Sequence, residues 1–508
     1  MPDRRLQDLQ AATDVQPADL LYGTQSGQSR KFTVAQIRGR ADWYIDPRDF
    51  GAAFDNETDD TAAMQAAIDS LGSTVTARGG RVILPKGTAV ISDTLLIERR
   101  AVMMEGQGWG PTGSSDGTTF RWTGHNDRPM IRVREGMGSK FSDFRLLGNP
   151  DTAHRPTAGI ELHVEHATQR QPNSYMTFNR VWFGRFAGYD SPADDLGAGG
   201  DYLTAGLATA GASALDNLQN DMSRIAGCVF YQVGTGYKTA AWNTQAVLNK
   251  IESCAFYYCG TGVFSVAQTM LDNVYFAWSS ICDLHIQQDR FTCWNYTSEY
   301  ARQMAKIEPN GELFVHTGYF QVGHNLRDDG RIIDAINDTR TVIELTAFDF
   351  RENEDYATTH RGVPAVLAIK AATNGTLAHK VLGLHHVNYG IGGMRQAFGP
   401  AHLEIDPGRK GQGLDDLTIY GELQGPPDAS GQGITRPFYN YLHSKNPVPD
   451  FCTDQRMQQG LAIPRIKAGP PTDADYPNPP ADGTMVIDST QGKLYVRLKG
   501  AWRSAALS

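Results

Sequence analysis

The sequence predicts an all-β fold in which the chain winds into a solenoid of stacked parallel strands. Three observations lead to this prediction. Short strand-like segments recur at steps of 20 to 26 residues, each carries an aromatic residue at the same place, and a single amphipathic helix precedes them. Glycine is also abundant, with 53 residues among 508, as expected for a fold with many tight turns.

The repeated segments align without gaps around one aromatic position. They are FNRVWFGRF (178–186), IAGCVFYQV (225–233), IESCAFYYC (251–259) and LDNVYFAWS (271–279). The matching residues are Phe183, Phe230, Phe256 and Phe276, and Tyr296 continues the series. If each coil lies on the one before, neighbouring strands are roughly 4.8 Å apart and the matching rings form one dry interior column. A sandwich of antiparallel strands is the rival fold, but its strands recur about every 8–12 residues and give no reason for aligned phenylalanines.

One step in the series, from Phe183 to Phe230, is too long for a single coil. The intervening residues 191–221 are rich in Gly and Ala and only weakly periodic. They predict an excursion from the coil, a loop with a helical piece.

The stretch FGAAFDNETDDTAAMQAAIDS (50–70) predicts a capping helix over residues 61–70. Oxygens for its N-cap are offered by Asp59, Asp60 and Thr61. Its apolar stripe is formed by Ala63, Ala66, Ala67, Ile68 and Leu71. A parallel coil leaves its first rung unpaired, so a helix placed just before GGRVILPKG (79–87) is expected to cover that rung.

Both ends of the chain read as small units that depend on neighbours. Residues 1–42 predict two short strands joined by a turn, with too little surface to fold alone. Residues 43–345 are expected to form the coil, and 346–466 its late rungs or a β-rich extension. Residues 467–483 carry five prolines, which predicts a linker, and residues 484–508 predict a small β module.

The composition narrows the classes of partner. The net charge of −9 disfavours nucleic acid and anionic membranes, but it leaves polysaccharides open. No apolar run of 18 residues and no signal peptide are visible, so synthesis in a cytosol is expected. The six cysteines lack metal-site spacing and are expected to be buried free thiols. The motif HVEH (163–166) and the pair His385–His386 bring no third ligand, so neither a metal nor a cofactor is predicted.

The capping stretch, the following GGRVILPKG and the strand that leads into GQGWG (106–110) carry a resemblance to a known family. They resemble the start of the right-handed parallel β-helix of the pectate-lyase superfamily, as found in phage tailspikes. The resemblance is strong over about residues 49–110 and weak to about 320, and Ala89 stands where the family pattern has Tyr. Residues 8–37 resemble the N-terminal anchors of phage appendages, and residues 482–504 resemble modules at their tips.

This order of anchor, β-helix, linker and tip implies a spike on the head or tail of a phage or gene-transfer particle. Such spikes are homotrimers that lie on the particle surface and are made in the host cytoplasm. The resemblance therefore implies three kinds of partner: host surface polysaccharide, particle proteins bound through residues 1–42, and further copies of the chain. Nucleic acid and membrane are not expected as partners.

The repeat register supplies candidate catalytic residues. Glu252 and Asp272 occupy the same position of consecutive coils, so their Cβ atoms should lie roughly 5 Å apart. Such proximity is expected to raise the pKa of one carboxyl and to give an acid/base pair for cleavage of a glycosidic bond. A solvated polar ladder is the alternative interpretation.

Aromatic residues supply candidate binding residues. Tyr258 and Trp278 share the next ladder, and Tyr257, Trp294 and Tyr300 lie close by in sequence. Sugar rings stack on exposed aromatic faces, so these five residues are predicted to bind a glycan, with core packing as the alternative.

Three functions remain open from the sequence. The first is a spike that binds host polysaccharide, the second is the same spike with glycoside hydrolase or polysaccharide lyase activity, and the third is a structural or adaptor fibre.

Overall fold

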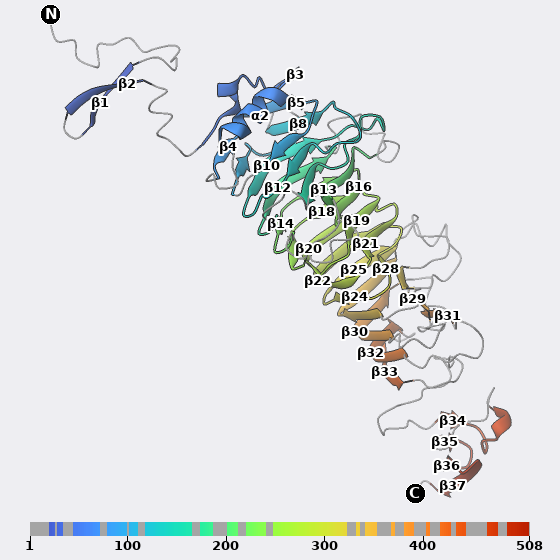
Figure 1. Cartoon of the computed structure of the whole chain (residues 1–508). Coiled ribbons are helices and arrows are strands. Elements are labelled where there is room, and N and C mark those ends of the chain that lie inside the picture. Colours follow the sequence, from blue (N-terminus) through green and yellow to red (C-terminus); the bar gives the residue numbers. More distant parts are fainter. Residues whose placement is uncertain are drawn as a thin grey trace, which may run out of the picture.

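The computed structural model has an all-β fold built of stacked parallel coils, which confirms the predicted parallel β-helix (Figure 1). In the large sheet the described strands pair in parallel until β33, which pairs with β32 in the antiparallel sense. The structure describes residues 20–25, 28–33, 44–71, 79–98, 101–109, 117–164, 173–185, 201–211, 220–239, 247–322, 332–335, 341–352, 367–370, 380–390, 403–406, 417–427, 433–442, 465–475 and 485–506.

Two sheets form the walls of the coil. The larger sheet comprises β3 (Asp55–Asp59), β4 (Arg81–Ile83), β5 (Gly87–Ile91), β7 (Met103–Glu105), β8 (Thr118–Trp122), β10 (Lys140–Leu147), β12 (Thr177–Gly184), β14 (Arg224–Ala226), β15 (Val229–Tyr231), β17 (Asn249–Glu252), β18 (Ala255–Tyr257), β20 (Thr269–Ala277), β22 (Asp289–Glu299), β24 (Gly311–Val315), β25 (Gly318–Val322), β27 (Thr341–Thr346), β28 (Phe348–Glu352), β30 (Lys380–Gly390), β32 (Leu417–Pro427) and β33 (Gly433–Leu442). The second sheet comprises β6 (Leu95–Ile97), β9 (Ile131–Val133), β11 (Ile160–Val164), β13 (Leu203–Gly211), β16 (Val233–Lys238), β19 (Thr261–Ser265), β21 (Cys282–Ile286), β23 (Ala305–Ile307), β26 (Ile333–Ala335), β29 (Leu367–Lys370) and β31 (Leu403–Asp406).

Each coil turns two corners between its three strand segments. In the coil of β17, β18 and β19, the first corner is at Ser253 and the second at Tyr258, with φ angles of 51° and 53°. In the next coil β20 covers both segments of the large sheet and bends at Asn273, where φ is 52°. A residue in this left-handed conformation changes the direction of a strand within one residue, which is how the large sheet wraps around two sides of the core.

The register confirms that residues about twenty positions apart are neighbours. Glu252 pairs with Asp272 on the adjacent strand, and Phe256 pairs with Phe276. The excursion is partly a strand rather than a helix, because Leu203–Gly211 forms β13 of the second sheet. The sequence of this strand, LTAGLATAG, is rich in small residues. They are needed because a Cβ atom on Gly206 would lie only 2.5 Å from the Phe230 ring.

The predicted aromatic column is present in the core. Centroids of successive rings from Phe183 through Phe230 and Phe256 to Phe276 are 4.8, 4.7 and 4.8 Å apart, with interplanar angles of 3° to 14°. Tyr296 follows at 5.4 Å. All five side chains are fully buried, so the column forms the centre of the hydrophobic core.

A row of glycines in the second sheet makes room for this column. A Cβ atom on Gly206, Gly236 or Gly262 would lie 2.4 to 2.5 Å from the ring of Phe230, Phe256 or Phe276 respectively. The three glycines occupy the same register position on β13, β16 and β19. Each phenylalanine therefore packs directly on backbone across the core, which is possible only while the facing residue has no side chain.

The next coil replaces this pair of Phe and Gly by a polar pair. Asp283 takes the register position of the glycines, and Ser298 takes that of the phenylalanines. Tyr296 is the register neighbour of Val274, so it joins the column from two residues earlier than the sequence series predicts. The Asp283 carboxylate is fully buried and accepts hydrogen bonds from the hydroxyls of Ser279 (2.5 Å), Tyr296 (2.5 Å) and Ser298 (2.6 Å). Burial raises the pKa of Asp283 to about 7, against the opposing effect of the three hydroxyl donors.

The helix α2 (Thr61–Ser70) lies at the start of the coil stack, as predicted for a cap (Figure 1). Its Gln65 side chain completes the edge of the second sheet. The amide Nε2 donates to the carbonyl of Leu96 (3.0 Å), and Oε1 accepts from the Leu96 N–H (2.8 Å). The side chain thus replaces a neighbouring strand for β6, so the first rung is not left open to pairing with another chain.

Two details of the predicted cap are wrong. The Asp60 carboxylate makes no N-cap bond and accepts instead from the backbone N–H groups of Ala53 and Phe54, while Asp59 accepts from Thr61 N–H. Met64, Ala67 and Ile68 form the buried stripe, whereas Ala66 is exposed. Ala63 and Leu71 of the predicted stripe are partly buried against the core.

The ends of the chain form small sheets. The described part of residues 1–42 is an antiparallel hairpin of β1 (Leu20–Gln25) and β2 (Gln28–Thr33). Near the other end, β34 (Arg465–Lys467), β35 (Met485–Asp488), β36 (Lys493–Leu498) and β37 (Ala501–Ala506) form a four-stranded sheet. The described residues also form two short 3-10 helices, η2 (Pro47–Phe50) and η5 (Asp473–Asp475).

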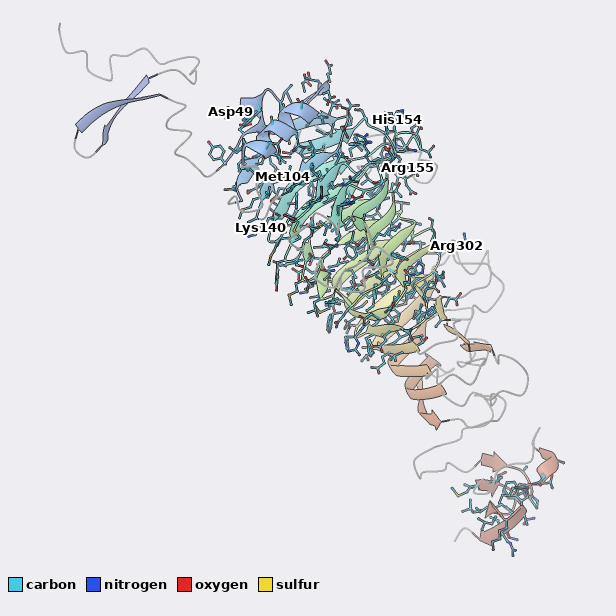
Figure 2. All side chains as sticks on the ribbon, in the orientation of Figure 1. Asp49, Met104, Lys140, His154, Arg155 and Arg302 are labelled. Carbon is cyan, nitrogen blue, oxygen red and sulfur yellow. The ribbon has the colours of Figure 1, made fainter. Side chains whose placement is uncertain are left out.

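Three further features concern the whole described chain. Side chains cover the coil stack from Asp49 near α2 to Arg302 and beyond (Figure 2). Among the described residues no helix is long and apolar enough to cross a membrane. The five described cysteines are buried free thiols, as predicted, and Cys452 lies outside the described residues.

Candidate functional site

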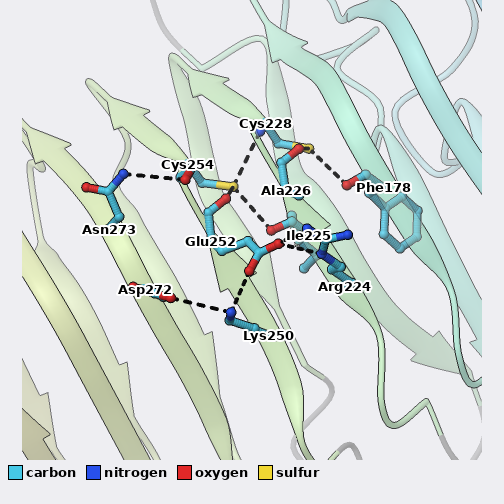
Figure 3. Close-up of polar contacts among 11 residues, drawn as sticks. Phe178, Arg224, Ile225, Ala226, Cys228, Lys250, Glu252, Cys254, Asp272 and Asn273 are labelled. Atoms are coloured by element: carbon cyan, nitrogen blue, oxygen red, sulfur yellow. Dashed lines mark hydrogen bonds and ion pairs between the residues drawn. The ribbon is translucent and has the colours of Figure 1, made fainter.

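The predicted carboxylate pair lies on the outer side of the first strand segment, where alternation along β17 also places Lys250 (Figure 3). The Lys250 ammonium is 2.5 Å from Glu252 Oε2 and 3.4 Å from Asp272 Oδ2. Arg224, from the preceding coil, contacts the other oxygen of Glu252. The two carboxylates are therefore neighbours in register, but a cation lies between them.

These cations reverse the expected electrostatics. The hydrogen bond from Lys250 is the main cause that lowers the pKa of Glu252, and Arg224 adds to it. The expected rise of a pKa by repulsion between carboxylates is therefore wrong for Glu252. At neutral pH this carboxyl is ionised and has no proton to give to a leaving oxygen.

Trp294 belongs to the same side of the coil as this pair. It is the register neighbour of Asp272, and its ring stacks on that of His316 with centroids 5.3 Å apart. Its side chain is 38% exposed. The structure thus separates Trp294 from the other four predicted binding residues, which lie beyond the corner at Asn295.

Tyr258, Trp278 and Tyr300 form a stacked ladder at the second corner. The ring centroids are 4.9 Å apart from Tyr258 to Trp278 and 5.0 Å apart from Trp278 to Tyr300, with interplanar angles of 8° and 11°. All three rings are half-buried. Their backbones are left-handed, with φ angles of 53°, 55° and 57°.

This ladder is costly for the fold. A bulky residue rarely adopts a positive φ, and the left-handed conformation costs roughly 1–2 kcal/mol per residue. The same conformation recurs at other corners of the coil, such as Gln232 with φ 50° and Ser253 with φ 51°, so it is a property of the turn. The stacking also corrects the expected binding mode, because both faces of the Trp278 ring are covered by Tyr258 and Tyr300. The ladder can offer a ligand only its ring edges and its polar groups.

A carboxylate that the sequence reading did not single out lies beside the ladder. Glu299 precedes Tyr300 and accepts hydrogen bonds from two phenols, Tyr275 OH at Oε2 (2.8 Å) and Tyr319 OH at Oε1 (2.8 Å). The rings of Tyr275 and Tyr257 are 5.4 Å apart, which joins this network to the aromatic residues of the preceding coil.

The surroundings keep both phenols in the donor form. Burial raises the pKa of Tyr275 and of Tyr319, and the Glu299 carboxylate raises both further. Beyond Tyr319, the guanidinium of Arg351 lies 4.2 Å from the centre of its ring and is paired with Asp349 at 2.9 Å. Each Glu299 oxygen holds one phenol, which leaves lone pairs for further hydroxyl donors.

These residues make one continuous surface on the outer side of the second strand segment. We call it the aromatic face, and it consists of Tyr257, Tyr258, Tyr275, Trp278, Glu299, Tyr300 and Tyr319. Toward the start of the chain it continues into Tyr231, which is buried and 5.4 Å from Tyr258, then into Trp182 and Trp109. The register could have revealed Glu299, since Tyr257, Ala277 and Glu299 are equivalent positions.

Metal ligands do not gather on the described residues. No group of three His, Cys, Asp or Glu side chains there could hold an ion. His163 contacts Glu161 at 2.9 Å, and Glu161 is also paired with Arg132, so His163 of HVEH belongs to a polar cluster on the second sheet. The side chains of His385 and His386 lie outside the described residues.

Comparison with known proteins gives a family model for part of the chain. Residues 44–129 match the model described as rhamnogalacturonase A/epimerase, pectate lyase-like. Alginate lyase 7 of Azotobacter vinelandii is 36% identical over 124 residues, which is 22% of this chain and 14% of that protein. Mannuronan C5-epimerase AlgE3 of the same organism is 38% identical over 115 residues, 20% of this chain and 6% of the epimerase. The chain thus spans less than a sixth of the length of these curated relatives.

Solved structures resemble the chain at low identity. DFA-IIIase from Arthrobacter chlorophenolicus A6 has a TM-score of 0.48 at 12% identity, over 80% of this chain and all of that chain. The tailspike protein of Acinetobacter baumannii phage AM24 has a TM-score of 0.38 at 12% identity, over 78% of this chain and 58% of the tailspike. The match to the family model makes residues 44–129 a pectate-lyase-like segment, and in the structure this segment opens the parallel β-helix.

Proposed function

We propose that the chain is a spike of a phage or phage-like particle that binds host surface polysaccharide along the aromatic face. The observation that carries the proposal is the stacked ladder of Tyr258, Trp278 and Tyr300, which lies beside a carboxylate with two phenol partners. Equivalent side chains recur about every 4.8 Å along the coil stack. Such a row suits a polysaccharide, because a polysaccharide is also a repeating polymer.

The chemistry of the aromatic face suits sugar hydroxyls. Carboxylate oxygens accept from hydroxyls, phenols donate and accept, and an indole donates, so vicinal hydroxyls of a sugar find partners of both kinds. The apolar edges of the rings cover the C–H groups between them. The two curated relatives are named for an alginate lyase and a mannuronan epimerase, which favours a polysaccharide as the class of ligand.

The rest of the proposed role follows from the order of the units. Residues 1–42 attach the spike to the head or tail of the particle, the β-helix presents the aromatic face, and the spike is a homotrimer on the particle surface.

Binding tests this function directly. Glu299→Gln keeps the shape of the side chain but removes its charge, and we expect about tenfold weaker binding of a responsive polysaccharide, equivalent to about 1.4 kcal/mol. Trp278→Ala should weaken binding by at least as much. The probes are alginate and a panel of purified bacterial capsular polysaccharides, measured by titration calorimetry. Trp294→Ala is the matched control, since it removes an exposed indole on the neighbouring side of the coil.

Each outcome of this titration is decisive. Loss in both variants of the aromatic face, with Trp294→Ala unchanged, supports the proposal. Equal affinities in all variants would contradict it. If no polysaccharide of the panel binds, the structural or adaptor fibre becomes the better function.

Cleavage of the polysaccharide is the second candidate, favoured by the curated relative named alginate lyase 7. The Glu252 and Asp272 pair on consecutive coils is the predicted site for it. If this pair is catalytic, Glu252→Gln and Asp272→Asn each reduce the release of reducing ends from a bound polysaccharide at least a hundredfold. Because Lys250 keeps Glu252 ionised, we expect unchanged release in both variants. Release that is unchanged removes the pair as the catalytic site.

A further inference from the structure

The buried Asp283 carboxyl connects the two segments of chain that carry the ladder of the aromatic face. Its Oδ1 atom accepts from Ser279, which directly follows Trp278. Its Oδ2 atom accepts from Ser298, which directly precedes Glu299. One side chain inside the coil thus joins two consecutive coils, by bonds of 2.5 and 2.6 Å, at the place where their outer side is the aromatic face.

Backbone hydrogen bonds join the same two segments. The Trp278 N–H donates to the carbonyl of Glu299 (3.0 Å), and the Arg302 N–H donates to the carbonyl of Ser279 (2.9 Å). The rings of Trp278 and Tyr300 are therefore aligned only while the two segments keep this spacing.

The titratable groups that face Asp283 inside the coil are uncharged. Tyr296 of β22 donates to it, and Cys259 lies on the preceding coil. Burial raises the pKa of the Tyr296 phenol and of the Cys259 thiol, so both keep their protons near pH 7. Cys282, the preceding residue on β21, is a buried free thiol.

The nearest charged groups of the second sheet lie on its outer side. The His285 ring is 3.2 Å from Glu308, which also pairs with Lys306 at 2.6 Å. These three side chains are partly exposed, whereas Asp283 is fully buried. Among the described residues no Lys, Arg or His side chain forms an ion pair with Asp283, and none contributes to the rise of its pKa.

We propose that Asp283 is a positioning residue of the aromatic face, and that loss of its proton weakens polysaccharide binding. The protonated carboxyl bonds to its hydroxyl partners without a charge in the core. The ionised carboxyl is a buried charge without a cation, and entry of water relieves that state. Water enters when the segments that carry Trp278 and Glu299 separate, and separation removes the alignment of the ladder.

The direction of the pH effect follows from linkage. A polysaccharide on the aromatic face keeps water out of the corner, so the complex holds the proton of Asp283 more firmly than the free protein does. Affinity is therefore highest below about pH 7 and falls as the pH rises above it. If the pKa of Asp283 is higher by about one in the complex, the full loss is about tenfold. The proposal rests on the proposed function, because it concerns the affinity of the same face.

Titration calorimetry at pH 5.5 and pH 8.5 tests the proposal. The probe is the polysaccharide, from alginate and the capsular panel, that the unmodified protein binds and that has no phosphate or amino group. We expect about fivefold or more weaker binding by the unmodified protein at pH 8.5. Asp283→Asn should bind equally at both pH values, since the amide has no proton to lose. His285→Gln is the matched control, and there the pH effect should persist, because this ring lies on the outer side of the sheet.

Ser279→Ala is a second variant that keeps the carboxyl. Burial raises the pKa of Asp283, and the hydrogen bond from Ser279 opposes that rise. Removal of this hydroxyl therefore raises the pKa further, and in a series of pH values the loss of affinity should occur at a higher pH than in the unmodified protein. A merely structural contact would weaken binding at every pH and leave the midpoint unchanged.

Amide hydrogen exchange of the free protein examines the corner without a ligand. After correction for the intrinsic effect of pH, peptides that contain Trp278 and Tyr300 should exchange about tenfold faster at pH 8.5 than at pH 5.5. In Asp283→Asn the corrected rates should be equal at both pH values. The peptide of β10, Lys140–Leu147, serves as the internal control and should not respond to pH.

The two measurements separate failure of this inference from failure of the proposed function. Equal affinity of the unmodified protein at both pH values, a pH effect that persists in Asp283→Asn, or equal corrected exchange at the corner would each overturn the inference and leave the proposed function standing. No binding at pH 5.5 would overturn the proposed function, whereas the exchange rates would still decide whether Asp283 holds the corner.

Discussion

Gly236→Val is expected to destabilise the β-helix by about 3 kcal/mol or more, because it puts a side chain where the aromatic column touches backbone. A Cβ atom at this position would lie 2.5 Å from the Phe256 ring and 2.6 Å from the carbonyl oxygen of Gly262. The ring is sandwiched between Phe230 and Phe276 at 4.7 and 4.8 Å, so it has no space to move away. Thermal unfolding followed by circular dichroism would show a much lower midpoint.

A glycine at the first corner is the matched control. Gly227 has φ 59°, and its register neighbours Ser253 and Asn273 adopt the same conformation with side chains. Nothing lies closer than 3.4 Å to a Cβ atom at Gly227. Gly227→Asn should therefore shift the midpoint little. Similar midpoints for Gly236→Val and the unmodified protein would mean that the ring and the glycine row are not in contact.

The second large effect concerns pH and is due to Asp283. Its pKa is about 7 in the folded chain and 3.8 in the unfolded chain, so between these values the folded state binds a proton that the unfolded state lacks. Stability from this group is fully present below about pH 4, falls as the pH rises, and is lost above about pH 7. The shift corresponds to about 4 kcal/mol at most.

Asp283→Asn tests this assignment, since the amide keeps the shape and has no charge to bury. Urea unfolding between pH 4 and pH 8 should show a smaller loss of stability with rising pH than in the unmodified protein. Asp127→Asn, at a position whose side chain is 72% exposed, should leave the slope unchanged. Parallel curves for Asp283→Asn and the unmodified protein would show that Asp283 is ionised throughout, or neutral throughout.

The sequence predicts the parts of this fold that repeat. The aromatic column was predictable because Phe256 and Phe276 recur with the same neighbours, and burial demands the same residue type on each coil. Asp283 at the glycine position and Ser298 at the phenylalanine position interrupt both repeats, so no periodicity of the sequence predicts them. The sequence does not predict the glycine row either, since the reason for glycine at this position is the contact between β16 and the Phe256 ring in the folded chain.

The candidate site was predictable in part. Register alone gave the neighbours Glu252 and Asp272, and the ladder of Tyr258 and Trp278. The predicted electrostatics of the first pair left out Lys250. This residue lies two positions before Glu252 and therefore on the same side of the strand. Glu299 was not predicted because its partners Tyr275 and Tyr319 come from the coils on either side and are offset from it by two residues in register, so an alignment of equivalent positions does not pair them with it.

Hydroxyl-radical footprinting with and without a bound polysaccharide tests the central claim most directly, because it reads the exposure of individual tyrosine and tryptophan side chains. If the aromatic face is the binding surface, the polysaccharide lowers the oxidation of Tyr258, Trp278 and Tyr300. Oxidation of Trp294 and of Tyr175, which is 53% exposed at another corner, stays unchanged. Protection of Trp294 with no change at Trp278 would place the ligand on the side of Glu252 and Asp272 and contradict the account.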